Sequence, residues 1–398
     1  MKILGIETSC DETAVCLIET DKEVGNIKIL GNQLYSQIAL HAQYGGVFPM
    51  MAKREHAKNL IPLFERCLEE ASCIKEVRSP ILESAREKLK ELLVKEMDIF
   101  DQIIELAEKI EKPNIDAIAV TNGPGLEPAL WVGVNFAKAL EIIWNIPIIP
   151  TNHMEGHILV AAIDKIKTEE SPSKAKETPQ FLLKEIKFPA IALLISGGHT
   201  QLVLAKDNLQ YEIVGNTRDD AVGEAFDKVA RILGLPYPGG PQISKLAEKE
   251  RAENPDKKPP YPLPRPMIHS GDLDFSFSGL KTAVLYTVKK IPEMTEEIKQ
   301  EIACEFENAV LEVLTKKTFE AVRKYSAKTI IIGGGVSANK KIRNDFTEKS
   351  KAEDVELMIP EVNASTDNAF MIALAGAINL EAGKKTATDF RASGNLSL

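Results

Sequence analysis

Short apolar runs rich in β-branched residues recur along the chain, and polar or glycine-rich turns separate them. Residues 2–7 (KILGIE) and 13–19 (TAVCLIE) flank the polar turn TSCDE, so they predict two strands joined in a hairpin. From Pro189 the pattern returns as PAIALLI, the small-residue turn SGGHT and QLVLA. This repetition indicates two copies of one structural unit.

A second pair of segments supports the duplication. The run IDAIAV leads into the loop TNGPGLEP and a helix predicted from Ala129, and KTIIIGGGVSAN leads into a helix through Lys340 to Phe346. In each copy a buried strand delivers a glycine loop to the start of a helix. The pattern therefore predicts two α/β lobes facing each other across a cleft, with ligands beyond the carboxyl ends of the strands.

Two stretches interrupt this pattern. Residues 74–112 carry apolar positions at helical spacing among many charges, which predicts an added helical hairpin, either a partner surface or a lid on its own lobe. Residues 165–187 are polar and rich in Lys and Glu, as in a solvated linker.

The expected domain organisation follows from these boundaries. Residues 1–163 form the N-terminal lobe, with the helical insertion at about 74–112. Residues 164–187 form a linker or insertion, and residues 188–398 form the C-terminal lobe. The helix expected at 368–382 is a candidate to cross back onto the first lobe.

Composition narrows the class of protein. The 398 residues are 44% hydrophobic and 27% charged, which is typical of a globular enzyme and excludes a disordered or fibrous chain. No apolar run approaches the roughly 20 residues that a membrane span needs, so we expect a cytoplasmic protein without a membrane partner. The net charge of −9 means that any RNA contact needs a local basic patch or a partner protein. The five cysteines form no CxxC pair, so we expect them to be reduced.

The segment HMEGH is the sharpest chemical feature. If it is helical, His153 and His157 lie on one face and can reach a single ion; the alternative is a pair of histidines without a ligand. Peptidase chemistry is disfavoured, because the metalloprotease motif is HExxH. Asp367 is the candidate third ligand, although its spacing alone favours capping of the following helix. Two imidazoles and a carboxylate suit ferrous iron and also zinc, and such a site would join the two lobes.

Glycine loops and isolated acidic residues are weaker signals. The loops 196–200 (SGGHT) and 333–339 (GGGVSAN) could hold an anion or a nucleotide, although glycines also simply make turns, and neither continues as a Walker loop. Asp11 and Glu12 lie in the first hairpin turn, where they could approach a phosphate or metal-bound water or only be solvated. Asp227 could bind a hydroxyl or ammonium group, or pair with Arg231.

Taken together, the motifs occur in the order seen in one family. The chain closely resembles the bacterial and organellar tRNA N6-adenosine threonylcarbamoyltransferases, formerly called O-sialoglycoprotein endopeptidases. The resemblance covers nearly the whole chain except the two insertions. The motifs that carry it are ETSCDET at 7–13, GPGL at 123–126, HMEGH at 153–157, SGGHTQL at 196–202, GEAFDK at 223–228, YPGGP at 237–241, DFSFSGLKT at 274–282, GGGVSAN at 333–339 and TDNAFMIA at 366–373.

The resemblance implies a fold and a reaction. The fold is actin-like and sugar-kinase-like (the ASKHA class), with two ribonuclease-H-like lobes. The reaction moves the threonylcarbamoyl group of threonylcarbamoyl-AMP to N6 of the adenosine beside the anticodon in tRNAs reading ANN codons. It requires one divalent metal, with Fe2+ favoured and Zn2+ as the other option. The implied partners are an actin-like subunit and a P-loop ATPase of the same pathway, or a second copy of the chain.

The resemblance also implies site residues, position by position. The metal ligands fall on His153, His157 and Asp367. Asp11 and Glu12 match acidic residues that assist activity in a less settled role. The substrate-binding positions fall on Leu194, Ile195, Ser196, Gly197, Gly198, Asp227, Gly240 and Asn339.

Two further readings compete with a transferase, and the chain departs from the family pattern at Met50 and Met51 and in the segment TNGPGLEPALWVG, which differs from the usual small-residue run. A nucleotide-dependent kinase or ATPase of the same superfold would also use glycine loops, but it has no need of two imidazoles. A non-catalytic scaffold copy would be expected to lose a metal ligand, and all three are present. Met50 and Met51 stand where the family usually has an acidic and an aliphatic residue, which affects the expected tRNA or partner contacts.

Overall fold

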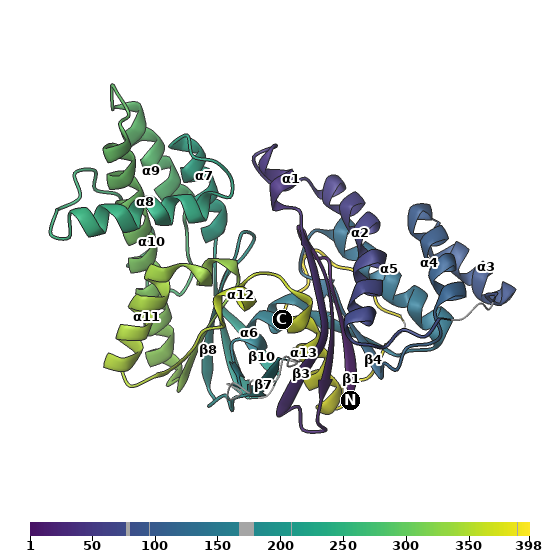
Figure 1. Cartoon of the computed structure of the whole chain (residues 1–398). Helices are drawn as coiled ribbons and strands as arrows, with labels where there is room; N and C mark the ends of the chain where they lie inside the picture. Colours follow the sequence, from purple (N-terminus) through teal and green to yellow (C-terminus); the bar gives the residue numbers. More distant parts are fainter. Residues whose placement is uncertain (77–79, 95, 167–178, 208, 388) are drawn as a thin grey trace, which may run out of the picture. The chain divides into compact units, whose positions relative to one another are not determined.

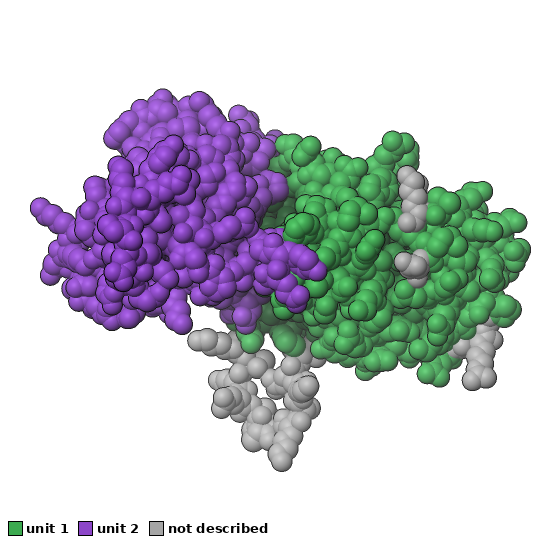
Figure 2. All heavy atoms as spheres, turned by 90° about the horizontal axis from the view of Figure 1, so that it is seen from above, with its two compact units in different colours: residues 1–41, 47–185, 367–398 green, residues 42–46, 186–366 purple. Residues whose placement is uncertain are grey.

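The computed structural model describes residues 1–76, 80–94, 96–166, 179–207, 209–387 and 389–398. The chain forms two compact units, which Figure 2 shows in different colours. Unit 1 contains residues 1–41, 47–185 and 367–398, and unit 2 contains residues 42–46 and 186–366. Each unit is built around its own sheet.

The sheet of unit 1 has the strand order β5-β4-β1-β2-β3-β7-β6. Strands β1, β2 and β3 pair antiparallel, whereas β4 pairs parallel with β1 and β5 parallel with β4. The predicted hairpin is therefore confirmed. The bounds are β1 Lys2–Glu7, β2 Glu12–Thr20, β3 Asn26–Ser36, β4 Ala117–Gly123, β5 Ile148–Asn152, β6 Ile163–Lys165 and β7 Gln180–Leu183.

The sheet of unit 2 has the order β10-β9-β8-β11-β12. Strands β8, β9 and β10 pair antiparallel, and β11 pairs parallel with both β8 and β12. This repeats the order β3-β2-β1-β4-β5 of unit 1, so the duplication and the fold class of two ribonuclease-H-like α/β lobes are confirmed. The bounds are β8 Ala190–Ile195, β9 Thr200–Asp207, β10 Gln210–Asn216, β11 Thr329–Gly333 and β12 Glu356–Met358.

Helices cover both sheets (Figure 1). In unit 1 they are α1 Ile38–Ala42, which runs into the first residue of unit 2, α2 Pro49–Glu70, α3 Glu83–Leu92, α4 Met97–Lys109, α5 Glu127–Trp144, α6 His153–Val160 and α13 Ala369–Glu381. In unit 2 they are α7 Val222–Ile232, α8 Gly239–Glu253, α9 Ser278–Lys289, α10 Glu296–Tyr325, the 3-10 turn η1 Gly335–Ala338, α11 Lys340–Ala352 and α12 Val362–Ser365.

Alternation along β1 explains how the sheet of unit 1 is covered on both faces. Leu4 and Ile6 belong to the apolar cluster that includes residues of α2 and α5. Gly5 points the other way, toward α13, where a Cβ atom would lie 2.2 Å from the carbonyl oxygen of Ala369. A glycine in this strand therefore allows α13 to pack directly on the backbone of β1.

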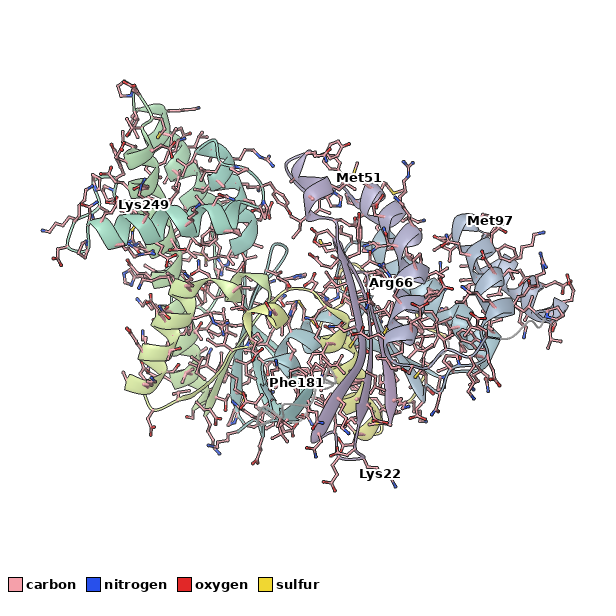
Figure 3. The ribbon with its side chains drawn as sticks, viewed as in Figure 1. Lys22, Met51, Arg66, Met97, Phe181 and Lys249 are labelled. Atoms are coloured by element: carbon pink, nitrogen blue, oxygen red, sulfur yellow. The ribbon has the colours of Figure 1, made fainter. Side chains whose placement is uncertain are left out.

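The two insertions contain regular structure. Helices α3 and α4 lie within residues 74–112. Strand β7 lies within the expected linker 164–187, where it pairs with β3 and β6. Its Phe181, labelled in Figure 3, has its ring 5.3 Å from that of Phe370. Residues 167–178 of that linker lie outside the described residues.

Candidate metal centre and nucleotide pocket

The two histidines are placed by the junction of β5 and α6. Strand β5 ends at Asn152, whose side-chain oxygen accepts hydrogen bonds from the backbone N–H groups of Met154 (2.9 Å) and Glu155 (3.4 Å). Because this cap starts the helix at His153, residues four apart share a face, and the rings of His153 and His157 lie 4.7 Å apart. The helical spacing predicted for HMEGH is confirmed.

Asp367 lies beside both imidazoles. Its Oδ1 atom is 3.1 Å from Nε2 of His157 and 3.4 Å from Nε2 of His153, and one ligand atom from each residue lies within 4.8 Å of the others. All three residues belong to unit 1, so the expectation that such a site would join the lobes is wrong. The capping role considered for Asp367 is also wrong, because Asn368 caps α13 by accepting from the N–H of Met371.

A buried carboxylate that the sequence analysis missed orients the first histidine. Glu7, the last residue of β1, is fully buried. It accepts hydrogen bonds from Nδ1–H of His153 (3.0 Å) and from the hydroxyl of Thr121 (2.7 Å). This orients the ring of His153 and directs its Nε2 atom toward Asp367. The signal in the sequence was an acidic residue at the end of an otherwise apolar strand.

The charges of the cluster are coupled. Burial alone would lower the pKa of His153, but the carboxylates of Asp367 and Glu7 outweigh it and raise that pKa well above its ordinary value. Burial alone would raise the pKa of Asp367, but His153 and His157 outweigh it and lower that pKa. The Asp367 carboxylate therefore lies beside the imidazole rings of both histidines.

These residues fit a divalent cation. Two imidazole nitrogens and one carboxylate oxygen converge, and the acidic partner of His153 is the kind of outer group that metal-bound histidines use. Nδ1 of the buried His157 has no hydrogen-bond partner within the described part of the chain. Three protein ligands would leave coordination positions open to a substrate oxygen. The structure therefore has a possible metal site.

The acidic pair of the first turn is also in unit 1. Asp11 and Glu12 are buried where the turn meets β2. Burial, followed by the charges of Asp11 and Asp367, raises the pKa of Glu12 to about 10. Glu12 is therefore protonated at neutral pH and can donate a hydrogen bond.

Unit 2 contains a separate cavity of about 550 Å³ between α7, α8, the η1 turn and α11. Four of the implied substrate residues line it, namely Gly197, Asp227, Gly240 and Asn339. Apolar side chains such as Phe226 share the wall with charged groups. A cavity of this size and mixed lining suits a nucleotide.

The other four implied substrate residues lie just outside the lining. Leu194 and Ile195 are fully buried in β8. Ser196 and Gly198 flank Gly197 in the loop that follows, and the Ser196 hydroxyl accepts a hydrogen bond from the N–H of Gly198 (3.3 Å). The strand thus delivers the loop to the cavity.

Asn339 is held from three sides. Its side-chain oxygen caps α11 by accepting from the N–H of Ile342 (3.0 Å). Its amide group donates to the hydroxyl of Ser244 (2.8 Å) and to the buried carboxylate of Glu307 (2.6 Å). Arg251 donates to the same carboxylate (2.6 Å), so the negative charge of Glu307 is balanced in the cavity wall.

Asp227 makes a structural hydrogen bond and also lines the cavity. Its carboxylate accepts a hydrogen bond from the N–H of Gly239 at the start of α8 (2.7 Å). The approach of α7 and α8 is close here, because a Cβ atom on Gly239 would lie 2.5 Å from that of Ala230. Asp227 thus joins the YPGGP turn to α7.

The two methionines that depart from the family pattern lie at the start of α2. Met50 and Met51 lie in the first turn of α2, and Met50 is 60% exposed (Figure 3 labels Met51). Within the described ranges, no helix combines the length and apolar character needed to cross a bilayer.

Comparisons with known proteins agree on one family. Residues 28–77 and 89–374 match the family model described as "TsaD: tRNA N6-adenosine threonylcarbamoyltransferase". The chain is 42% identical to the protein of that name from Chromobacterium violaceum, over 96% of this chain and 94% of the relative. It is 38% identical to the Bacillus subtilis protein of that name, over 100% of this chain and 96% of the relative.

Among solved structures, the activator of the 2-hydroxyisocaproyl-CoA dehydratase from Clostridium difficile with bound ADPNP is similar with a TM-score of 0.45. The two are 10% identical, and the similarity covers 96% of each chain.

Proposed function

The chain belongs to the tRNA N6-adenosine threonylcarbamoyltransferase family, and from this premise we propose that it transfers the threonylcarbamoyl group of threonylcarbamoyl-AMP to tRNA. The acceptor is N6 of the adenosine beside the anticodon, at position 37, in tRNAs reading ANN codons. The observation that carries the proposal is the convergence of His153, His157 and Asp367 in a chain of this family. A kinase or ATPase of the same superfold is not favoured, because it has no use for this cluster.

We propose that the three converging residues hold one divalent cation, Fe2+ in preference to Zn2+. Two histidines and one carboxylate form the ligand set typical of ferrous sites with open positions. When bound, the cation supplies a Lewis acid for carbonyl or phosphate oxygens. Glu7 orients the ring of His153 for this role.

Unit 2 provides the binding site for the adenylate in this proposal. The cavity combines the glycine loop after β8 with the N-terminus of α11, where backbone N–H groups favour a phosphate. Phe226 offers an apolar face to the base. The balanced pair of Arg251 and Glu307 keeps Asn339 in place without leaving an unpaired carboxylate to repel the anion.

The reaction itself needs a proton acceptor. The N6 amine attacks the carbamoyl carbon, the bond from that carbon to the AMP phosphate oxygen breaks, and the amine loses a proton. We assign that proton to Asp11, next to the protonated Glu12, which can hydrogen bond to it. The Asp11→Asn variant is expected to lower the rate of transfer by about 100-fold, and unchanged turnover would remove Asp11 from the reaction.

The proposal also covers the partner proteins and the cellular location of the reaction. The partners are an actin-like subunit and a P-loop ATPase of the same pathway, or a second copy of the chain, and the reaction takes place in the cytoplasm. Met50, exposed at the start of α2, lies on the surface where an altered partner contact is expected.

The proposal is tested by supplying labelled threonylcarbamoyl-AMP and ANN-decoding tRNA, with and without candidate partner proteins. We expect label on the tRNA with the wild-type chain and its loss with His153→Ala. A Glu155→Gln variant serves as the matched control on α6, because Glu155 bonds Asn379 rather than the cluster. Label that appears equally with His153→Ala would contradict the role of the cluster.

A further inference from the structure

The segment 389–398 packs along the C-terminal ends of β4 and β5 in unit 1. The N–H of Ser393 donates to the carbonyl oxygen of Asn122 (2.8 Å), and the N–H of Gly125 donates to that of Gly394 (3.1 Å). The side-chain amide of Asn152 donates to the carbonyl oxygen of Ser397 (3.1 Å). Figure 1 shows this C-terminal end, in yellow, beside α6. The segment therefore links the end of β4 to the junction of β5 and α6, through two backbone hydrogen bonds and one from a side chain.

The segment packs closely against unit 1 and is held there by side-chain contacts. A Cβ atom on Gly123 would lie 2.1 Å from the carbonyl oxygen of Ser393, so the glycine of the GPGL loop makes room for the tail. Ala392 is buried. Before it, Lys138 donates to the carbonyl oxygen of Phe390 (2.7 Å) and lies 4.7 Å from the centre of its ring.

Asn152 connects the tail to the candidate metal centre. Its oxygen caps α6, and its amide nitrogen bonds the tail. The next residue along the chain is His153, and α6 carries both histidines. Because the tail bond fixes the orientation of the Asn152 side chain, it also fixes the cap and the start of the helix. The residues that match the family model end at 374, so the tail lies outside the matched range.

We propose that residues 393–398 are a positioning strap that holds the metal-binding helix ready for its ion. The strap acts through Asn152 on the position of His153 and His157. It raises metal affinity because the ligands are then ordered before the cation arrives. The inference rests on the proposed metal site.

The test is the affinity for Zn2+, measured by competition with a chromophoric chelator. We compare the wild-type chain, a variant that ends at Ala392, and Asn152→Ser. Serine caps a helix about as well as asparagine but cannot donate to Ser397 in the same way, so it separates the strap from the cap. We expect zinc binding to weaken about tenfold in the shortened chain, as for other groups that support metal ligands, and to a smaller extent in Asn152→Ser.

Controls separate this effect from loss of structure or of the metal site. Thr295→Ser changes a helix cap in unit 2 in the same conservative way and should leave zinc affinity unchanged. AMP affinity, which depends on the cavity of unit 2, should be the same in every variant. Wild-type zinc binding no tighter than that of His153→Ala means that the proposed metal site fails. Wild-type zinc affinity in the folded shortened chain, or an equal loss of AMP affinity, overturns the strap. If the shortened chain does not fold, unchanged affinity in Asn152→Ser overturns it.

Discussion

Glu7 illustrates how one buried side chain organises the candidate metal centre. Its carboxylate accepts from His153, from the Thr121 hydroxyl and from the N–H of Ser9. A charge buried this completely is tolerated because three donors satisfy it. These three donors lie near the C-terminal ends of the parallel strands. The carboxylate therefore also links β1 to β4 and α6.

The Glu7→Gln variant is expected to weaken metal binding about tenfold, because an amide in place of the carboxylate is a weaker acceptor for the Nδ1–H of His153. The measurement is zinc affinity by chelator competition. Glu70→Gln is the matched control, since Glu70 is a carboxylate of unit 1 that bonds the exposed N–H of Asn32. Equal affinities in the two variants would show that Glu7 does not support the centre.

His56 provides a pH-dependent measure of stability away from the metal ligands. It is fully buried on α2, where Thr13 faces its Nδ1 (2.7 Å) and its Nε2–H donates to the carbonyl oxygen of Cys10 (3.0 Å). Burial lowers its pKa from 6.5 to about 4, although the Cys10 bond and Glu7 oppose this. Neutral His56 therefore holds the turn that carries Asp11.

Because the folded pKa is below the unfolded one, stability from His56 is complete above pH 6.5 and falls as the pH drops toward 4. Between pH 7 and pH 5 the loss is about 2 kcal/mol. Urea unfolding at both values should show this loss in the wild-type chain and in the control His269→Gln, which changes an exposed histidine. His56→Gln should lack it. An identical pH dependence in all three proteins would refute the assignment.

At the residue scale the sequence predicted the candidate metal ligands but not the residues that support them. His153, His157 and Asp367 were predicted, the histidines from spacing and all three from the family pattern, because metal chemistry restricts the residue types. Glu7 and His56 were missed because their roles depend on which strands and helices become neighbours, and no local pattern contains that information.

Helix α13 begins two residues after Asp367, and it packs closely on the sheet of unit 1. The helix lies on β1, β2 and β4. On Gly376 a Cβ atom would lie 2.3 Å from that of Ala119, and on Gly5 one would meet the backbone of Ala369. Small residues on both surfaces therefore set the distance between the helix and the sheet, and with it the position of Asp367.

Gly376→Ala is expected to push α13 away from β4, lowering the free energy of unfolding by about 1–3 kcal/mol and weakening zinc binding. Denaturant unfolding and chelator competition measure the two effects. Gly25→Ala is the control, because its Cβ atom would approach nothing closer than 3.7 Å. Normal stability and zinc affinity in Gly376→Ala would mean that the packing of α13 does not determine the position of Asp367.

The elements were largely predictable where their hydrophobic pattern is strong. Strands β1, β2, β8 and β9 follow β-branched runs, and long helices such as α10 follow helical spacing. Strand β7 was not predicted, because residues 165–187 have the composition of a solvated segment and β7 forms only by pairing with β3 at the sheet edge.

At the scale of the whole molecule, the chain places its two candidate functions in different units. The metal ligands lie in unit 1 and the nucleotide cavity in unit 2. The sequence predicted the duplication behind this arrangement. It also offered the helix expected at 368–382 as a candidate to cross back onto the first lobe, and the chain does return to unit 1 at Asp367.

This division predicts that the two binding activities can be lost separately. His153→Ala should abolish tight zinc binding and leave AMP affinity within about twofold, since no group of the cavity is altered. Asn339→Ala should weaken AMP binding about tenfold or more and leave zinc affinity unchanged. Calorimetric titration of both ligands with both variants checks this. A joint loss in either variant would contradict independent sites.

The most direct test of the account is anomalous scattering from crystals of the chain grown with Fe2+. A single peak at the iron edge is expected, about 2.0–2.2 Å from Nε2 of His153, from Nε2 of His157 and from a carboxylate oxygen of Asp367. A peak at other residues, or no peak at saturating iron, would contradict the claim that these three side chains share one catalytic ion.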